Sequence, residues 1–108
     1  MGRVDGTDTT TLRGSFTVAA VGDCIVSRPL LPMVGVDRSF AEVVTLLRGS
    51  DATFGNLETS LVDLTDTAAV PSGLHDDWAL RAVPDTALDL RALGFDVFAR
   101  ANNHSTDW

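Results

Sequence analysis

The sequence contains no lysine, and its eight basic residues are all arginines against fifteen acidic residues, which gives a formal net charge of −7. Nucleic acids and anionic membranes bind basic patches, so this composition argues against either as the main partner. The single cysteine excludes an internal disulfide. No apolar run approaches the roughly 18 residues that cross a bilayer, so no membrane-spanning segment is predicted.

Residues 1–15 are polar and rich in glycine, threonine and aspartate, without the apolar stretch of a secretory signal. We expect them to form a flexible tail, and we take a cytoplasmic location as the default expectation. Residues 16–108 are expected to form one partial domain. The chain as a whole is 44% hydrophobic and 21% charged, which is typical of a globular protein.

Short apolar runs and amphipathic stretches alternate along the chain. Residues 16–21 predict a buried strand, which ends in Gly22-Asp23, and residues 51–55 and 95–99 predict two more strands. Residues 59–80 lack a clean period and predict a loop or excursion. Two helices are predicted between the strands, and the second runs from residue 84 or 85 to residue 93 and stops at Gly94.

The first helix has the clearest signals. Ser39 and Glu42 have the spacing of a capping box, and Gly49 supplies the stop. Its apolar residues recur at i, i+3, i+4 and i+7 and are expected to pack on the sheet: Phe40, Val43, Val44 and Leu47.

Strands that alternate with helices predict an α/β fold, in which parallel strands are joined by crossover helices. Ligands of such sheets bind beyond the carboxyl ends of the strands. Polar side chains follow all three predicted strands: Asp23, then Asn56 and Glu58, then Asn103 and His104. Carboxylate, amide and imidazole groups suit Mn, Fe, Zn or Mg, and a bridging carboxylate can hold two cations. The alternative is that these residues merely form turns.

Three motifs occur in a fixed order along the chain. Gly22-Asp23 is followed by Arg28 five residues after the aspartate, then Asn-Leu-Glu at 56–58, then Ala-Asn-Asn-His at 101–104 with Asp107 three residues later. This pattern, which spans residues 16–108, resembles the poly-gamma-glutamate capsule synthesis (CapA) family. That family is similar to the calcineurin-like metallophosphatases, so the resemblance implies an α/β/β/α sandwich around a site for two divalent metal ions.

The resemblance also implies roles for individual residues. Asp23, Glu58 and Asn103 would be metal ligands, with Glu58 as the bridging carboxylate. His104 would be catalytic and would polarise the substrate or leaving group.

Three further residues would assist these groups. Arg28 would hold an anionic group of the substrate, although a surface ion pair is an equal alternative for an arginine there. Asn56 and Asp107 would contact the metal ligands rather than the metal, and Asp107 would orient the loop that carries His104.

The chain departs from the family pattern because it contains no counterpart of the later histidine motifs. We therefore expect the amino-terminal part of a longer protein, inactive on its own. The predicted function is capsule polymer synthesis by a metal-dependent hydrolase that acts on an anionic polymer or phosphorylated substrate, with capsule-synthesis proteins as possible partners. The alternative is a non-catalytic component that keeps the fold and binds polymer or partner proteins.

Overall fold

The computed structural model describes residues 14–72 and 79–108. Most of the expected tail, residues 1–13, therefore lies outside the described residues, as does a stretch of the expected excursion, residues 73–78. The elements follow one another as strand, helix, strand, helix and strand, with a short excursion after the second strand. This order confirms the α/β prediction.

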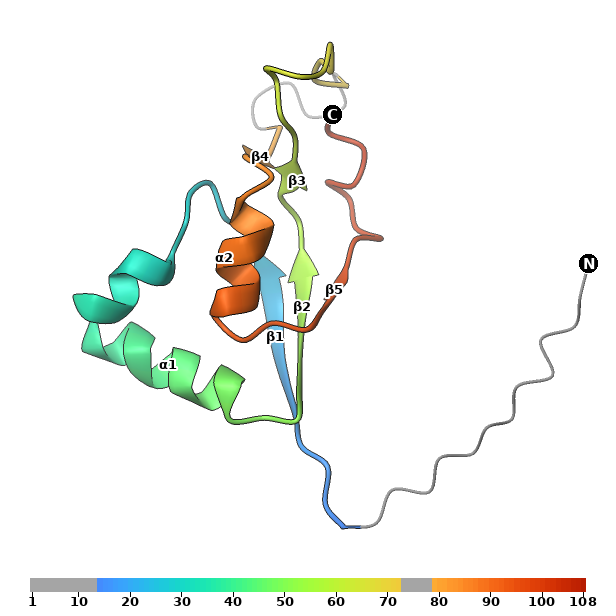
Figure 1. The fold of residues 1–108 in the computed structure, drawn as a ribbon. Coiled ribbons are helices and arrows are strands. Elements are labelled where there is room, and N and C mark those ends of the chain that lie inside the picture. The colour runs from blue at the N-terminus through green and yellow to red at the C-terminus, as the bar shows by residue number, and fades with distance from the viewer. Residues whose placement is uncertain (1–13, 73–78) are drawn as a thin grey trace, which may run out of the picture.

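The main sheet contains β1 (Val18–Cys24), β2 (Ala52–Leu57) and β5 (Val97–Ala99), in the order β1-β2-β5. Both strand pairs are parallel, so all three carboxyl ends lie at the same edge of the sheet. Figure 1 shows these ends meeting where the chain runs on from β2 towards β3. β1 begins and ends later than predicted, and the prediction of a buried strand is wrong, since most of its residues are exposed.

The short 3-10 helix η1 (Leu31–Gly35) leads into α1 (Arg38–Arg48), which ends at Gly49 as predicted. The predicted capping box is wrong. Asp37 is the N-cap, and its carboxylate accepts a hydrogen bond from the backbone N–H of Phe40 at 2.9 Å. Ser39 lies inside the helix because the aspartate two residues before it satisfies the first free backbone donors.

The second helix, α2 (Thr86–Ala92), ends at Gly94, whose φ of 109° is a conformation that favours glycine. Its Asp89 carboxylate accepts hydrogen bonds from the backbone N–H groups of Leu30 and Leu31, at 2.8 and 3.0 Å. One side chain of α2 therefore fixes the start of η1, and so sets the path of the chain between β1 and α1.

The core lies between the two helices and one face of the sheet. Its buried residues are Val26, Val44, Leu57, Leu90 and Leu93. Gly55 of β2 lies directly against the ring of Phe98, since a Cβ added at residue 55 would come within 2.8 Å of that ring. The expectation that Val43 packs on the sheet is wrong: it is 48% exposed, whereas Val44 is 2% exposed.

The opposite face of the sheet is open. Ala20, Phe54 and Val97 lie side by side across the three strands, and Val18 precedes them on β1. Val18, Phe54 and Val97 are 62%, 38% and 56% exposed. We call these four residues the open-face row.

A second, two-stranded sheet joins the start of the predicted excursion to the two residues that follow it. Its strands are β3 (Ser60–Leu61) and β4 (Arg81–Ala82), which pair in parallel. Each of these strands has only two residues, which is too short for a periodicity in the sequence to predict a strand. Within the described residues, no helix has the length and apolar character needed to cross a membrane.

Candidate functional site

The site begins with an irregularity in the pairing of β1 with β2. Ala20 pairs with Phe54, but the next pair is Asp23 with Asn56, so β1 advances by three residues while β2 advances by two. Without the extra residue, Gly22 would stand opposite Asn56. The extra residue therefore brings the Asp23 carboxylate beside Asn56, which is a known use of strand irregularities next to functional sites.

Asn56 is the centre of the site. Its side-chain Nδ2 donates to Asp23 Oδ1 at 2.9 Å and to Glu58 Oε1 at 3.3 Å. Its Oδ1 accepts a hydrogen bond from Nδ2 of Asn102 at 3.0 Å. One amide thus joins carboxylates from the ends of β1 and β2 to the turn that follows β5.

His104, in that turn, faces a carboxylate on either side of its ring. Nδ1 lies 2.8 Å from Asp107 Oδ2, and Nε2 lies 3.8 Å from Glu58 Oε2. His104, Glu58 and Asp107 are all buried. When Nδ1 carries a proton towards Asp107, the lone pair of Nε2 faces Glu58, so a proton or a cation between them would relieve the repulsion.

Asp107 also fixes the excursion. Its Oδ2 accepts a hydrogen bond from the backbone N–H of Leu80 at 2.8 Å, and its backbone carbonyl accepts one from the N–H of Ser72 at the same distance. The residue whose carboxylate orients His104 therefore also holds the excursion at Leu80, through its carboxylate, and at Ser72, through its backbone carbonyl.

The arrangement agrees in part with a cation site. Two carboxylates converge on one amide, and an imidazole lies next to one of them, which is a donor set that suits a hard or borderline cation. Among residues 14–72 and 79–108, however, no group of three or more His, Cys, Asp or Glu side chains is arranged to hold a metal ion. The described residues therefore bring donors of suitable chemistry to one edge of the sheet without forming a cation shell.

The structure brings together five of the seven residues singled out from the sequence: Asp23, Asn56, Glu58, His104 and Asp107. The other two, Arg28 and Asn103, are exposed. Asn102, its neighbour, makes the contacts within the site and was missed as a site residue. The only signal in the sequence was its place in the Ala-Asn-Asn-His motif, which does not say which amide faces inwards.

Cys24 directly follows Asp23 and is half-buried. Burial, and then the nearby charge of Asp23, raise the pKa of its thiol above 9.0. The thiol is therefore neutral near pH 7 and packs as a small apolar side chain beside Gly55.

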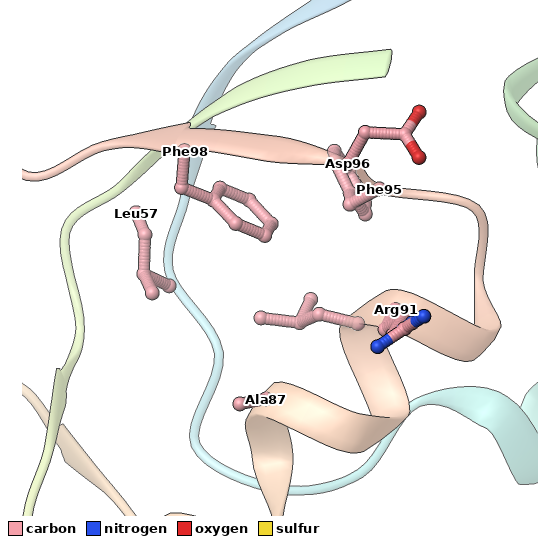
Figure 2. A pocket seen from close by; sticks show the side chains of 7 residues that line it. Leu57, Ala87, Arg91, Phe95, Asp96 and Phe98 are labelled. Carbon is pink, nitrogen blue, oxygen red and sulfur yellow. The ribbon is translucent and has the colours of Figure 1, made fainter. Parts of the chain in front are cut away.

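A cavity of about 310 Å³ lies away from this site, between α2 and β5 (Figure 2). The rings of Phe95 and Phe98 and the side chain of Leu57 form its walls, with Arg91 and Asp96 at its edge. A second space, of about 250 Å³, lies between β1 and α1 and includes Asp23 in its lining. The carboxylate cluster thus does not line the first cavity, and Asp23 borders the second.

Comparison with known proteins defines the class to which this fold and site belong. Residues 17–108 match the family of bacterial capsule synthesis proteins known as PGA_cap. The chain belongs to this family, which confirms the resemblance drawn from the three motifs.

Individual relatives extend the comparison. The chain is 41% identical over 105 residues to two Sinorhizobium fredii (strain NBRC 101917 / NGR234) proteins, "Uncharacterized protein y4sH" and "Uncharacterized protein y4uA", and the match covers 97% of this chain. It is 32% identical over 98 residues to the capsule biosynthesis protein CapA of Bacillus anthracis, over 86% of this chain. The chain spans 22% of the length of the first two relatives and 23% of the third.

Proposed function

We propose that this chain contributes one side of a divalent-metal site in an enzyme of capsule polymer synthesis. The observation that carries the proposal is the convergence of Asp23 and Glu58 on one amide, with His104 Nε2 3.8 Å from Glu58. Membership of the capsule synthesis family supports the polymer as the biological context. Poly-gamma-glutamate, or another anionic polymer of the cell envelope, is the proposed substrate class.

Asp23 and Glu58 would hold the cation, with Asn103 as a further proposed ligand and the remaining ligands outside the described residues. Mn, Fe, Zn and Mg all suit oxygen and imidazole donors. When bound, the metal supplies polarisation of a phosphoryl or carbonyl oxygen and activation of water. The negative charge of the two carboxylates provides the attraction for the cation, and the half-buried Asn56 amide holds them at a fixed separation.

His104 would act on the substrate or leaving group. Its contact with Asp107 fixes the ring and leaves Nε2 directed towards the Glu58 side of the site. Such an oriented imidazole can pass a proton to a leaving oxygen or nitrogen. Arg28 is exposed in the bend that follows β1, and its guanidinium would bind a carboxylate or phosphate of the polymer.

The test is a calorimetric titration with Mn²⁺ and Zn²⁺, together with hydrolysis assays on a phosphodiester and on poly-gamma-glutamate. We would compare the 108-residue chain with a polypeptide extended through the downstream reading frame. In the extended protein we expect Asp23→Ala and Glu58→Ala to abolish metal binding. His104→Gln should retain binding and lose about 10²–10⁴-fold in turnover.

Asp66→Ala is the matched control, because Asp66 is an exposed carboxylate of the excursion. Metal binding that survives both Asp23→Ala and Glu58→Ala would overturn the proposed site. Polymer binding without metal binding or turnover would instead favour the non-catalytic component. The 108-residue chain alone is expected to bind metal weakly and to show no turnover.

A further inference from the structure

Asn102 is held in one orientation by backbone groups at both ends of its amide. Its Nδ2 donates to the backbone carbonyl of Leu57 at 2.9 Å, and its Oδ1 accepts from the backbone N–H of His104 at 3.1 Å. A carbonyl can only accept and an N–H can only donate, so these two contacts determine which end of the Asn102 amide carries the hydrogens.

This orientation fixes that of Asn56 in turn. The second contact of Asn102 Nδ2 is with Asn56 Oδ1, so the hydrogens of Asn56 must point the other way, towards Asp23 and Glu58. A rotation of the Asn56 amide by half a turn would place NH₂ against NH₂ on one side. On the other side it would place a carbonyl oxygen against two carboxylates.

We propose, resting on the function proposed above, that Asn102 is a positioning residue for the carboxylate pair. It locks Asn56 as a donor to Asp23 and Glu58, and so sets the separation at which these two carboxylates meet a cation. Asn56 is then a residue that holds the ligands, and its Oδ1 is not available to bind the cation itself. The turn after β5 thereby controls the geometry of groups on β1 and β2.

The first test follows the side-chain amide signals of Asn56 by ¹⁵N–¹H NMR, without metal, in the intact protein. Asn102→Ala removes the lock, so we expect the two Asn56 amide protons to shift and to exchange faster with water. Ser105→Ala is the matched control, because the Ser105 hydroxyl donates to the backbone carbonyl of Asn102 and does not touch its amide. Asn56 signals that stay unchanged in Asn102→Ala would overturn the proposal.

The second test is a double-mutant cycle on Mn²⁺ affinity with Asn56→Ala, Asn102→Ala and the two combined. We expect Asn102→Ala to weaken binding by about tenfold or more, as is common for residues that support metal ligands. Because Asn102 acts through Asn56, the combined variant should bind no more weakly than Asn56→Ala alone. Additive losses would show that Asn102 acts by another route and would contradict the proposal.

Asn102→Asp is the second variant, for use if Asn102→Ala does not fold. It keeps an acceptor for the His104 N–H and removes both donors, so the same Asn56 signals should move. The two proposals can fail separately. Absence of Mn²⁺ binding in the unmodified protein defeats the proposed function, while the metal-free NMR comparison still decides the role of Asn102.

Discussion

Asp51 fixes the point at which the chain enters the sheet. Its Oδ2 accepts hydrogen bonds from the backbone N–H and the hydroxyl of Thr17, at 2.7 and 2.8 Å. These donors stabilise the charged form, first the backbone N–H and then the hydroxyl, so they lower the pKa of Asp51 below its usual 3.8. A single exposed carboxylate thereby joins the segment before β1 to the loop before β2.

This contact predicts a pH-dependent contribution to stability. Because the pKa of Asp51 is lower in the folded chain than in the unfolded chain, its contribution is present above pH 3.8 and is lost as the pH falls through the folded value. We expect Asp51→Asn to unfold more easily than the unmodified chain near pH 6, with the difference vanishing at strongly acid pH. Urea unfolding across this range provides the measurement, and Asp66→Asn is the control. A difference that does not change with pH would contradict the assignment.

The two adjacent asparagines show what residue types can and cannot predict. The motif correctly marked the turn after β5, and Asp23, Glu58 and His104 were expected near one another because parallel strands end at one edge. It did not indicate that Asn102, rather than Asn103, would make the contacts with Asn56 and Leu57. That choice depends on the backbone carbonyl of Leu57, which lies far away in sequence and becomes a partner only after folding.

Among the elements, α1 shows how local signals compete. Two N-caps are available, Asp37 and Ser39, and both residue types favour that position. The N–H of Phe40 donates to the Asp37 carboxylate, so the helix begins at Arg38, two residues earlier than an N-cap at Ser39 would allow. The register of the apolar face also follows from packing, since Val44 and Leu47 reach the core while Val43 stays half-exposed.

The helix start gives a direct mutational test. Asp37→Ala should lower the free energy of unfolding by about 0.5–2 kcal/mol, because it leaves a backbone N–H of the first turn without its partner. Ser39→Ala should have an effect close to zero, since Ser39 lies within the helix and is exposed. Thermal and urea unfolding of both variants would decide the matter. A larger loss in the free energy of unfolding for Ser39→Ala than for Asp37→Ala would show that Ser39 is the N-cap, as in the predicted capping box.

The strand ends were predicted to within three residues, but the irregularity in β1 was not predicted. The apolar run of residues 16–21 gives no sign that β1 would gain an extra residue between Ala20 and Asp23. That residue is accommodated only when β2 lies beside it, so its cause is tertiary. The same holds for β3 and β4, whose pairing joins the start of the excursion to the segment that follows it.

At the scale of the whole molecule, the two faces of the sheet differ sharply. The helices cover one face, while the open-face row leaves apolar side chains in contact with water. Contiguous exposed apolar surface favours association. The net charge of −7 opposes this association. Physiological salt, however, limits the repulsion between the chains to a range of about 8 Å.

We therefore expect the 108-residue chain to self-associate through the open-face row. Phe54→Ser should weaken the association by about tenfold, which corresponds to about 1.4 kcal/mol of lost apolar burial. Leu88→Ser is the control, because Leu88 is 68% exposed but lies on α2. Sedimentation velocity at several concentrations measures both effects. Equal behaviour of the two variants would exclude the row as the contact surface.

The parallel order β1-β2-β5 has a consequence for the kinetics of folding. The contact of Asn56 with Asp23 closes a loop of 33 residues, and its contact with Asn102 closes one of 46. Neither can form from a local hairpin, so each must overcome the entropy of loop closure before any sheet contact compensates for it. During synthesis from the N-terminus, β1 and β2 can pair before β5 has been made. The carboxylates of Asp23 and Glu58 would then meet before Asn102 arrives to fix them, and the site would be among the last parts of the molecule to reach its final geometry.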